Sequence, residues 1–283
     1  MSVGEVARRL SRLETVIRPT RGWQAINLRE LVAHRDLLFF LLWRDLKVRY
    51  QQTAIGASWA IIQPLATMAI FTLVFGKLAR MPSDGVPYPL FCFGALVIWN
   101  LFVQGMTNAA ASVITNHQLI EKVYFPRLAI PFAAILAGLV DFLIAWLFLL
   151  ILMLIFGIMP GPRLIAVIPI VAFVCAASAG AGALLAALTV RFRDFKHLTP
   201  FIAQLWLFAT PVVYAASLVP ERWRHLLGLN PMAGMVEAFR WAMLGTDTIS
   251  WALVGLSALT SLLLLLCGLL VFRRMERSFA DFI

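Results

Sequence analysis

The sequence predicts an all-α membrane protein with six transmembrane helices, an N-terminal amphipathic interface helix and two short re-entrant helices between spans 5 and 6. Three observations lead to this prediction. Hydrophobic residues occupy 61% of the 283 positions and charged residues only 13%, against roughly 25% charged residues in a soluble domain. Several long stretches contain no Asp, Glu, Lys or Arg at all. Prolines and charges then interrupt the apolar pattern between residues 212 and 245.

Six apolar segments each have room for one spanning helix, because about 20 apolar residues cross a hydrocarbon core of roughly 30 Å. The third is interrupted only by Asp141. Pro87, Pro89 and the polar end Thr115–His117 shorten the second segment to a single helix. The segments are residues 55–76, 85–120, 128–162, 164–190, 198–220 and 248–272. We therefore expect residues 55–283 to form one six-span transmembrane domain.

The positive charges are unevenly distributed along the chain. Of the 24 Lys and Arg residues, 18 lie in residues 1–54, in the loops 116–131 and 191–199, and after residue 272. The positive-inside rule therefore places both termini and these loops in the cytoplasm. The net charge of +10 favours contact with anionic membrane lipids, and no nucleic-acid-binding signature is present.

The region before the first span divides into two parts. Residues 1–27 form a basic tail, and residues 28–54 are expected to contain the interface helix. At 100° per residue its large apolar side chains share one face, opposite most of its charges. They are Leu28, Val32, Phe39, Trp43, Leu46 and Tyr50. This pattern predicts a helix on the cytoplasmic membrane surface, and its wide apolar face also fits packing against protein.

The loop between spans 2 and 3 contains a second short helix. The run from Thr115 to Gln118 matches a capping box with Thr115 as N-cap, and Pro126 ends the helix. This loop carries Leu119, Phe125 and a charge pair, more than a chain reversal needs. Apolar residues facing the cytoplasm favour a docking surface for another protein, with a helix resting on lipid as the alternative.

The interrupted region 212–245 predicts two short helices. Pro220 and Pro231 suit the first turns of helices over about 220–227 and 231–244, which would re-enter the outer half of the membrane. Glu237 and Arg240, three residues apart, are expected to pair with each other, with a direct substrate role as the alternative.

Asp141 is an isolated acid within an apolar segment, where its burial costs on the order of 3 kcal/mol. We expect a structural hydrogen bond to a neighbouring helix. A proton relay is the alternative, which the lack of a second intramembrane acid disfavours.

No motif for catalysis or cofactor binding is found in the sequence. A GxxxxGK[ST] phosphate-binding loop, an HExxH or Cys/His metal spacing, a GxSxG nucleophile motif and a pair of acids suited to glycosyl hydrolysis are all absent. We therefore expect no catalytic residue, metal or cofactor in this chain.

Four stretches of the sequence together resemble a known family. They are LLWRDLKVRYQQTAIGASWAIIQPL (residues 41–65), LIEKVYFPRLAIP (119–131), VRFRDFKHL (190–198) and LNPMAGMVEAFRWAML (229–244). They are similar to the permease subunit of ABC exporters for bacterial surface polysaccharides, most closely the O-antigen type called Wzm. The resemblance implies a homodimer with two copies of a separate ATPase subunit, which binds ATP and Mg²⁺. The complex would export a lipid-linked polysaccharide across the bacterial inner membrane.

The resemblance also implies roles for particular residues. The loop after span 2 corresponds to a coupling helix, residues 116–125, that docks on the ATPase, and the interface helix contacts the ATPase too. Residues 212–245 correspond to a gate region on the outer side. The coupling residues are Asn116, Gln118, Leu119, Glu121, Lys122, Tyr124 and Phe125. The residues of the interface helix are Phe39, Trp43, Arg44, Asp45 and Lys47. The residues of the gate region are Glu221, Arg222, Asn230, Pro231, Glu237 and Arg240.

Aromatic residues on spans 1, 2 and 5 are candidates for a glycan path, because aromatic faces hold sugars weakly while Trp and Tyr keep a polar edge. Packing or an interfacial belt is the alternative for each of them. The candidates are Trp59, Trp99, Phe102, Trp206, Phe208 and Tyr214.

Two other functions remain open from the sequence. One is a related ABC permease that exports teichoic acid, capsule, lipid or drug. The other is an intramembrane glycan enzyme, which the short external loops and their lack of a catalytic set disfavour.

Overall fold

The computed structural model describes residues 35–51, 56–122, 125–276 and 279, and within them all regular secondary structure is helical. The predicted tail 1–27 and residues 28–34 of the predicted interface helix lie outside the described residues. The elements are α3 (Arg35–Gln51), η2 (Gly56–Ser58), α4 (Trp59–Phe71), η3 (Thr72–Leu78), α5 (Tyr88–Thr115), α6 (His117–Lys122), α7 (Ala129–Ile155), η4 (Pro162–Ala166), α8 (Val167–Arg191), α9 (Phe195–Ala209), η5 (Ala216–Leu218), α10 (Glu221–Leu227), α11 (Pro231–Leu244) and α12 (Trp251–Met275).

Five helices in the described chain are long and apolar enough to cross a membrane. They are Trp59–Leu78, Tyr88–Thr115, Ala129–Ile155, Pro162–Arg191 and Trp251–Met275, and they correspond to predicted spans 1 to 4 and 6. The predicted count of six is not confirmed, because the fifth segment forms α9 with only 15 residues. Thr210, which follows α9, has an extended backbone, as expected for a residue before proline.

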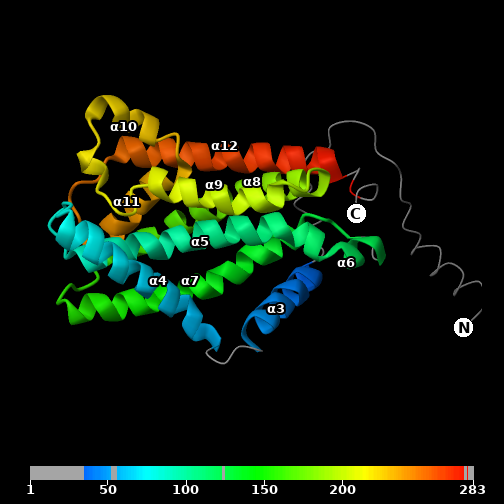
Figure 1. Cartoon of the computed structure of the whole chain (residues 1–283), viewed down its shortest axis with the longest axis horizontal. Coiled ribbons are helices and arrows are strands. Elements are labelled where there is room, and N and C mark those ends of the chain that lie inside the picture. Colours follow the sequence, from blue (N-terminus) through cyan, green and yellow to red (C-terminus); the bar gives the residue numbers. More distant parts are fainter. Residues whose placement is uncertain (1–34, 52–55, 123–124, 277–278, 280–283) are drawn as a thin grey trace, which may run out of the picture.

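The long helices run side by side and define two ends of the molecule (Figure 1). The short helix α6 lies at one end, near the last turns of α12, and α10 and α11 lie at the opposite end. We call these the α6 end and the α10 end. Helix α3 lies beside α7 towards the α6 end, and the two helices are in contact.

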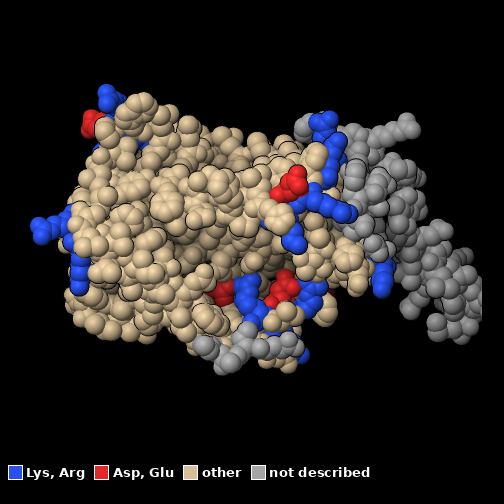
Figure 2. All heavy atoms as spheres, viewed as in Figure 1, with Lys and Arg blue, Asp and Glu red and all other residues tan. Residues whose placement is uncertain are grey.

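Helix α5 forms the centre of the bundle. It contacts α4, α7, α8, α9 and α11. In the most apolar stretch of α5, 78% of the residues are buried, whereas in that of Trp59–Leu78 only 6% are. The first span is therefore an outer element of the chain. Charged side chains gather at the two ends and near α3 on the face shown in Figure 2, with a broad uncharged belt between them. Such a belt matches the hydrocarbon layer of a bilayer.

Helices α8 and α12 cross at a pair of glycines. A Cβ atom added to Gly268 would lie 2.0 Å from the carbonyl oxygen of Gly180. One added to Gly180 would lie 2.4 Å from the backbone of Leu264. Small residues allow this close approach of two backbones, which is a common basis for helix association in membranes.

We predict that Gly268→Ala destabilises the bundle by about 1–3 kcal/mol, because the added methyl group meets backbone atoms that have no room to move. The measurement is the midpoint of thermal unfolding of the purified protein in detergent. Gly255→Ala on the same helix is the matched control, since its Cβ atom would have no heavy atom within 4 Å. Equal midpoints for the two variants would contradict the crossing as described.

Candidate functional site

The α6 end contains the short helix expected from the sequence, but its first turn differs from the prediction. The predicted N-cap role of Thr115 is wrong, because Thr115 is the last residue of α5 and its hydroxyl donates to the carbonyl of Ala111 at 3.0 Å. Asn116 instead ends α5, and its side-chain amide donates to the carbonyl of Ser112 at 2.8 Å. The Thr115 hydroxyl thus bonds to the carbonyl four residues earlier, as Thr commonly does within a helix.

Helix α6 has a packed side and an exposed side. Leu119 and Ile120 are partly buried and pack, together with the buried Phe125, on a cluster formed by α3 and the start of α7. Gln118 and Lys122 are exposed. Of the predicted coupling residues, Leu119 and Phe125 therefore attach the loop to the bundle, and Gln118 and Lys122 are available to a partner. The side chain of Glu121 and all of Tyr124 lie outside the described residues.

Helix α3 also has two different faces. Leu41 is 1% exposed and packs on Ala129, Ile130 and Ala133 at the start of α7. Phe39 and Trp43 are 67% and 61% exposed and point away from this contact. Of the predicted apolar stripe, Phe39 and Trp43 therefore keep free surface for lipid or partner protein, whereas Leu46 is partly buried and the hydroxyl of Tyr50 donates to Asp141. Leu28 and Val32 of the stripe lie outside the described residues.

The charged residues of α3 also divide between the two faces. Arg44 pairs with its neighbour Asp45 at 2.7 Å, and both side chains are only partly exposed. Lys47 is exposed. Of the predicted interface residues, Phe39, Trp43 and Lys47 thus have free surface, whereas Arg44 and Asp45 engage each other.

A further contact at the α6 end joins the loop after α6 to the last helix. The guanidinium of Arg127 donates to the carbonyl of Glu276, and it lies 5.9 Å from the centre of the Phe279 ring. The segment that follows α6 is therefore fixed both to α3 and to the end of α12.

The predicted path aromatics do not form one surface. Trp99 and Phe102 are 3% and 0% exposed and belong to the main core, so they pack rather than present a surface. Trp206 contacts Phe102 with ring centres 4.9 Å apart. Trp59 and Phe208 are exposed by about half, and Tyr214 is half-buried. Trp59, Phe208 and Tyr214 are therefore the candidates that keep surface for a substrate.

At the α10 end, Asn230 joins α9 to α11. It is the N-cap of α11, and its Oδ1 accepts bonds from the backbone N–H of Met232 and from the indole of Trp206, each at 2.9 Å. Its amide donates to Ala209 and Thr210 at the end of α9. Pro231 occupies the first turn of α11, where no N–H is needed.

Arg240 is a second polar centre at this end and is 4% exposed. Its guanidinium donates to the carbonyls of Phe91 at 3.1 Å and of Pro211 and Val212 at 2.7 Å each. It also lies over the Phe91 ring, 3.4 Å from the ring centre. Arg240 therefore fixes the non-helical segment after α9 to the start of α5.

The expected ion pair between Glu237 and Arg240 is wrong, since no ion pair joins them among the described residues. Arg240 binds the carbonyls of Pro211 and Val212, which lie outside any helix, and that of Phe91 in α5. Glu237 instead accepts a bond from the N–H of Ser250 at 3.2 Å, just before α12. Glu221 and Arg222, the other predicted gate residues, are exposed on α10.

Glu237 lies outside the five spanning helices, and burial raises its pKa from 4.5 to about 7. A raised native pKa means that this carboxyl contributes stability below about pH 4.5, which is lost as the pH rises through about 7. Glu237→Gln keeps an oxygen for the Ser250 N–H but does not ionise. We predict that this variant gains thermal stability relative to the wild type as the pH rises across that range.

The measurement is the unfolding midpoint of wild type, Glu237→Gln and Glu237→Ala as a function of pH. The Ala variant should lose the pH dependence as well but be less stable than the Gln variant at every pH, because the Ser250 N–H loses its acceptor. A constant difference between wild type and Glu237→Gln would contradict the role of burial at Glu237.

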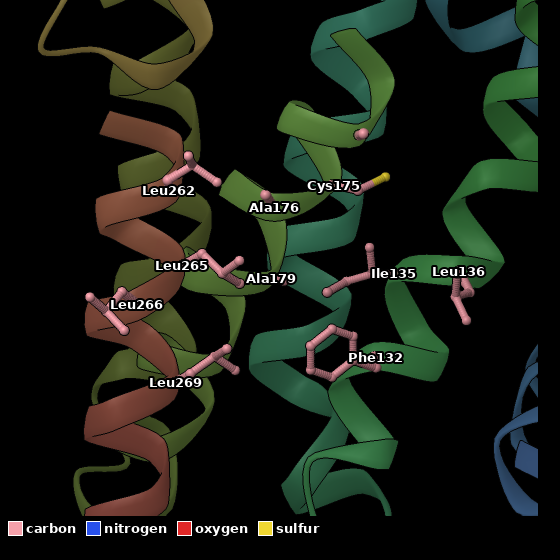
Figure 3. A pocket seen from close by; sticks show the side chains of 11 residues that line it. Phe132, Ile135, Leu136, Cys175, Ala176, Ala179, Leu262, Leu265, Leu266 and Leu269 are labelled. Carbon is pink, nitrogen blue, oxygen red and sulfur yellow. The ribbon is translucent and has the colours of Figure 1, made fainter. Parts of the chain in front are cut away.

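A separate groove of about 490 Å³ lies between α7, α8 and α12 (Figure 3). Its lining offers no side-chain hydrogen-bonding group beyond a thiol, so it suits lipid chains rather than sugar hydroxyls. It is lined by Phe132, Ile135, Leu136, Ala172, Cys175, Ala176, Ala179, Leu262, Leu265, Leu266 and Leu269. None of the predicted path residues is among them.

Within the described part of the chain, no three His, Cys, Asp or Glu side chains come close enough to hold a metal ion. The features that the structure does show are a helical membrane bundle, a short helix with a free polar side at one end, and buried polar centres at the other. They define a multi-pass helical membrane protein.

The chain belongs to the ABC-2 type transporter family, whose model matches residues 36–244. Relatives named O-antigen export system permease protein RfbA include one from Klebsiella pneumoniae and one from Myxococcus xanthus. The one from Klebsiella pneumoniae is 27% identical over 87% of this chain and 94% of its own length, and the one from Myxococcus xanthus is 29% identical over 75% and 82%. The polysialic acid transport protein KpsM of Escherichia coli is 20% identical over 84% of this chain and 93% of its own.

Proposed function

We propose that this chain is the membrane-spanning subunit of an ABC transporter that exports a lipid-linked polysaccharide of the O-antigen type across the bacterial inner membrane. The observation that carries the proposal is the similarity to O-antigen export permeases over most of both chains. Two copies of the chain would assemble with two copies of a separate ATPase, which binds ATP and Mg²⁺.

The α6 end supports this proposal as the docking site for the ATPase. Gln118 and Lys122 are exposed on α6, while Leu119 and Phe125 attach the loop to α3 and α7. A force applied to α6 therefore reaches the bundle through packed side chains. ATP drives export only if the ATPase binds one conformer of the permease more tightly than the other.

The outer surfaces of α4 and α9 support a homodimer with a path along it. The first span is only 6% buried within the chain, and Phe201, Leu205 and Phe208 on α9 are each exposed by more than half. Trp59, Phe208 and Tyr214 would face the glycan along these surfaces, and α10 and α11 would flank its exit. The distribution of Lys and Arg puts the α6 end and both termini in the cytoplasm.

Export of capsule polysaccharide is the second candidate, because KpsM and the Neisseria meningitidis capsule export protein CtrC are also relatives, at 20% and 23% identity. Their lower identity favours the O-antigen type. The same assay separates the two functions, with lipid-linked O-antigen and lipid-linked capsule polymer offered as substrates in parallel.

The test uses the full chain, coexpressed with the proposed partner ATPase and reconstituted in vesicles with lipid-linked glycan. We predict ATP-dependent glycan export by the wild-type complex. Lys122→Glu should lower the affinity for the ATPase about tenfold, or about 1.4 kcal/mol, because it reverses an exposed charge at the docking site.

Lys77→Glu is the matched control, since Lys77 is exposed on η3, a segment that lies at the α10 end (Figure 1). It should leave copurification of the ATPase unchanged. Equal loss for both variants would contradict docking at α6. Glycan export by the chain without any ATPase would contradict the proposed function itself.

A further inference from the structure

Asp141 lies inside the apolar α7, 12 residues after Ala129, and is held by the end of α3. One carboxylate oxygen forms an ion pair with the guanidinium of Arg49, and the other accepts a hydrogen bond from the hydroxyl of Tyr50. Only 12% of the Asp141 side chain is exposed. Burial and the carboxylate raise the pKa of Tyr50 well above its usual range, so the hydroxyl keeps the proton that it donates.

Four helices meet at this carboxylate. Besides α3 and α7, a cavity of about 10 Å³ at Asp141 is lined by Ala60 of α4 and by Asn100 and Gln104 of α5. A space of this size holds about one water molecule where polar groups surround it. The carboxylate and the two amides make the site polar within an otherwise apolar region. Any relative movement of α3, α4, α5 and α7 therefore changes the surroundings of the Asp141 carboxylate.

Helix α3 is attached to the bundle at two separated points. Near its first half, Leu41 packs with Phe125, Ala129 and Ile130 in a cluster that also receives Leu119 of α6. At its last turn, Arg49 and Tyr50 bind Asp141. The described residues thus form an unbroken series of contacts from α6 through α3 to the middle of α7. An apolar contact permits sliding, whereas an ion pair with a second hydrogen bond holds one geometry.

We propose that Arg49, Tyr50 and Asp141 form a joint through which movement of α6 and α3 is passed to α7, α4 and α5. The inference rests on the proposed function, since the ATPase supplies the movement. The three residues are positioning residues: they transmit the conformational change and do not contact the glycan. Without the joint, the ATPase would still dock on α6 and hydrolyse ATP, but the spans would no longer follow.

The test compares the complete complex carrying wild-type chain, Asp141→Asn, Arg49→Met and the double variant in vesicles. The three readouts are copurification of the ATPase, the rate of ATP hydrolysis, and glycan exported per ATP consumed. We expect the first two to stay within about twofold and the third to fall about tenfold in each single variant. The double variant should be no worse than the singles, because both substitutions break the same contact.

Two further variants keep the outcome clear. Tyr50→Phe removes one hydrogen bond and leaves the ion pair, so it should lower export per ATP by a smaller factor than Asp141→Asn. It replaces Asp141→Asn in the test if that variant does not fold. Asp247→Asn removes a solvent-exposed ion pair with Arg163, just before α12, and should change none of the readouts.

Export per ATP that stays at the wild-type value in Asp141→Asn, or in Tyr50→Phe where Asp141→Asn does not fold, would overturn the joint. Effects of Asp141→Asn and Arg49→Met that multiply in the double variant would overturn it as well. A wild-type complex that shows no ATP-driven export would instead overturn the proposed function and this inference with it. A working wild type with unaffected variants overturns the joint alone.

Discussion

The buried guanidinium of Arg240 satisfies a constraint on which the α10 end depends. Once α9 stops at Ala209, the following backbone has no helical partners, although it lies against the core. Unpaired carbonyls in such a place are costly, and a membrane environment offers no water to replace a donor. Arg240 supplies three donors in one rigid group and reaches Phe91, Pro211 and Val212 together. The chain can therefore leave the helical pattern here without losing the bundle.

The two ends of the molecule are built on different principles. The α10 end is held by short polar contacts at Arg240 and Asn230 that join α5, α9 and α11. At the α6 end, a short helix with an exposed polar side is attached through apolar packing to α3. A transporter that receives force at one end and releases a polymer at the other needs this difference. One end must be free to move with a partner, while the other keeps its backbone hydrogen bonds satisfied.

The sequence predicts the helices better than their contacts. Apolar runs and proline positions are local properties, so five spans, α6, α10 and α11 could all be located in advance. The partners of Arg240 could not, because they lie up to 149 residues away and are backbone carbonyls without a sequence signature. The local spacing of three residues instead favours Glu237 as the partner of Arg240. Thr115 was misassigned because its hydroxyl serves equally as a cap or as a donor to the preceding turn. The burial of Trp99 and Phe102 follows from the central place of α5, which composition alone does not reveal.

The most direct test of this account is the thermal stability of Arg240→Met compared with Arg222→Met in detergent. Methionine keeps the apolar stem of Arg240 but leaves the non-helical carbonyls of Pro211 and Val212 without donors, at a cost of about 2 kcal/mol or more. Arg222 is exposed on α10, and among the described residues its one partner is the ring of Trp223, whose centre lies 5.7 Å away. The account predicts a large fall of the unfolding midpoint for Arg240→Met and little change for Arg222→Met. Equal midpoints would contradict it.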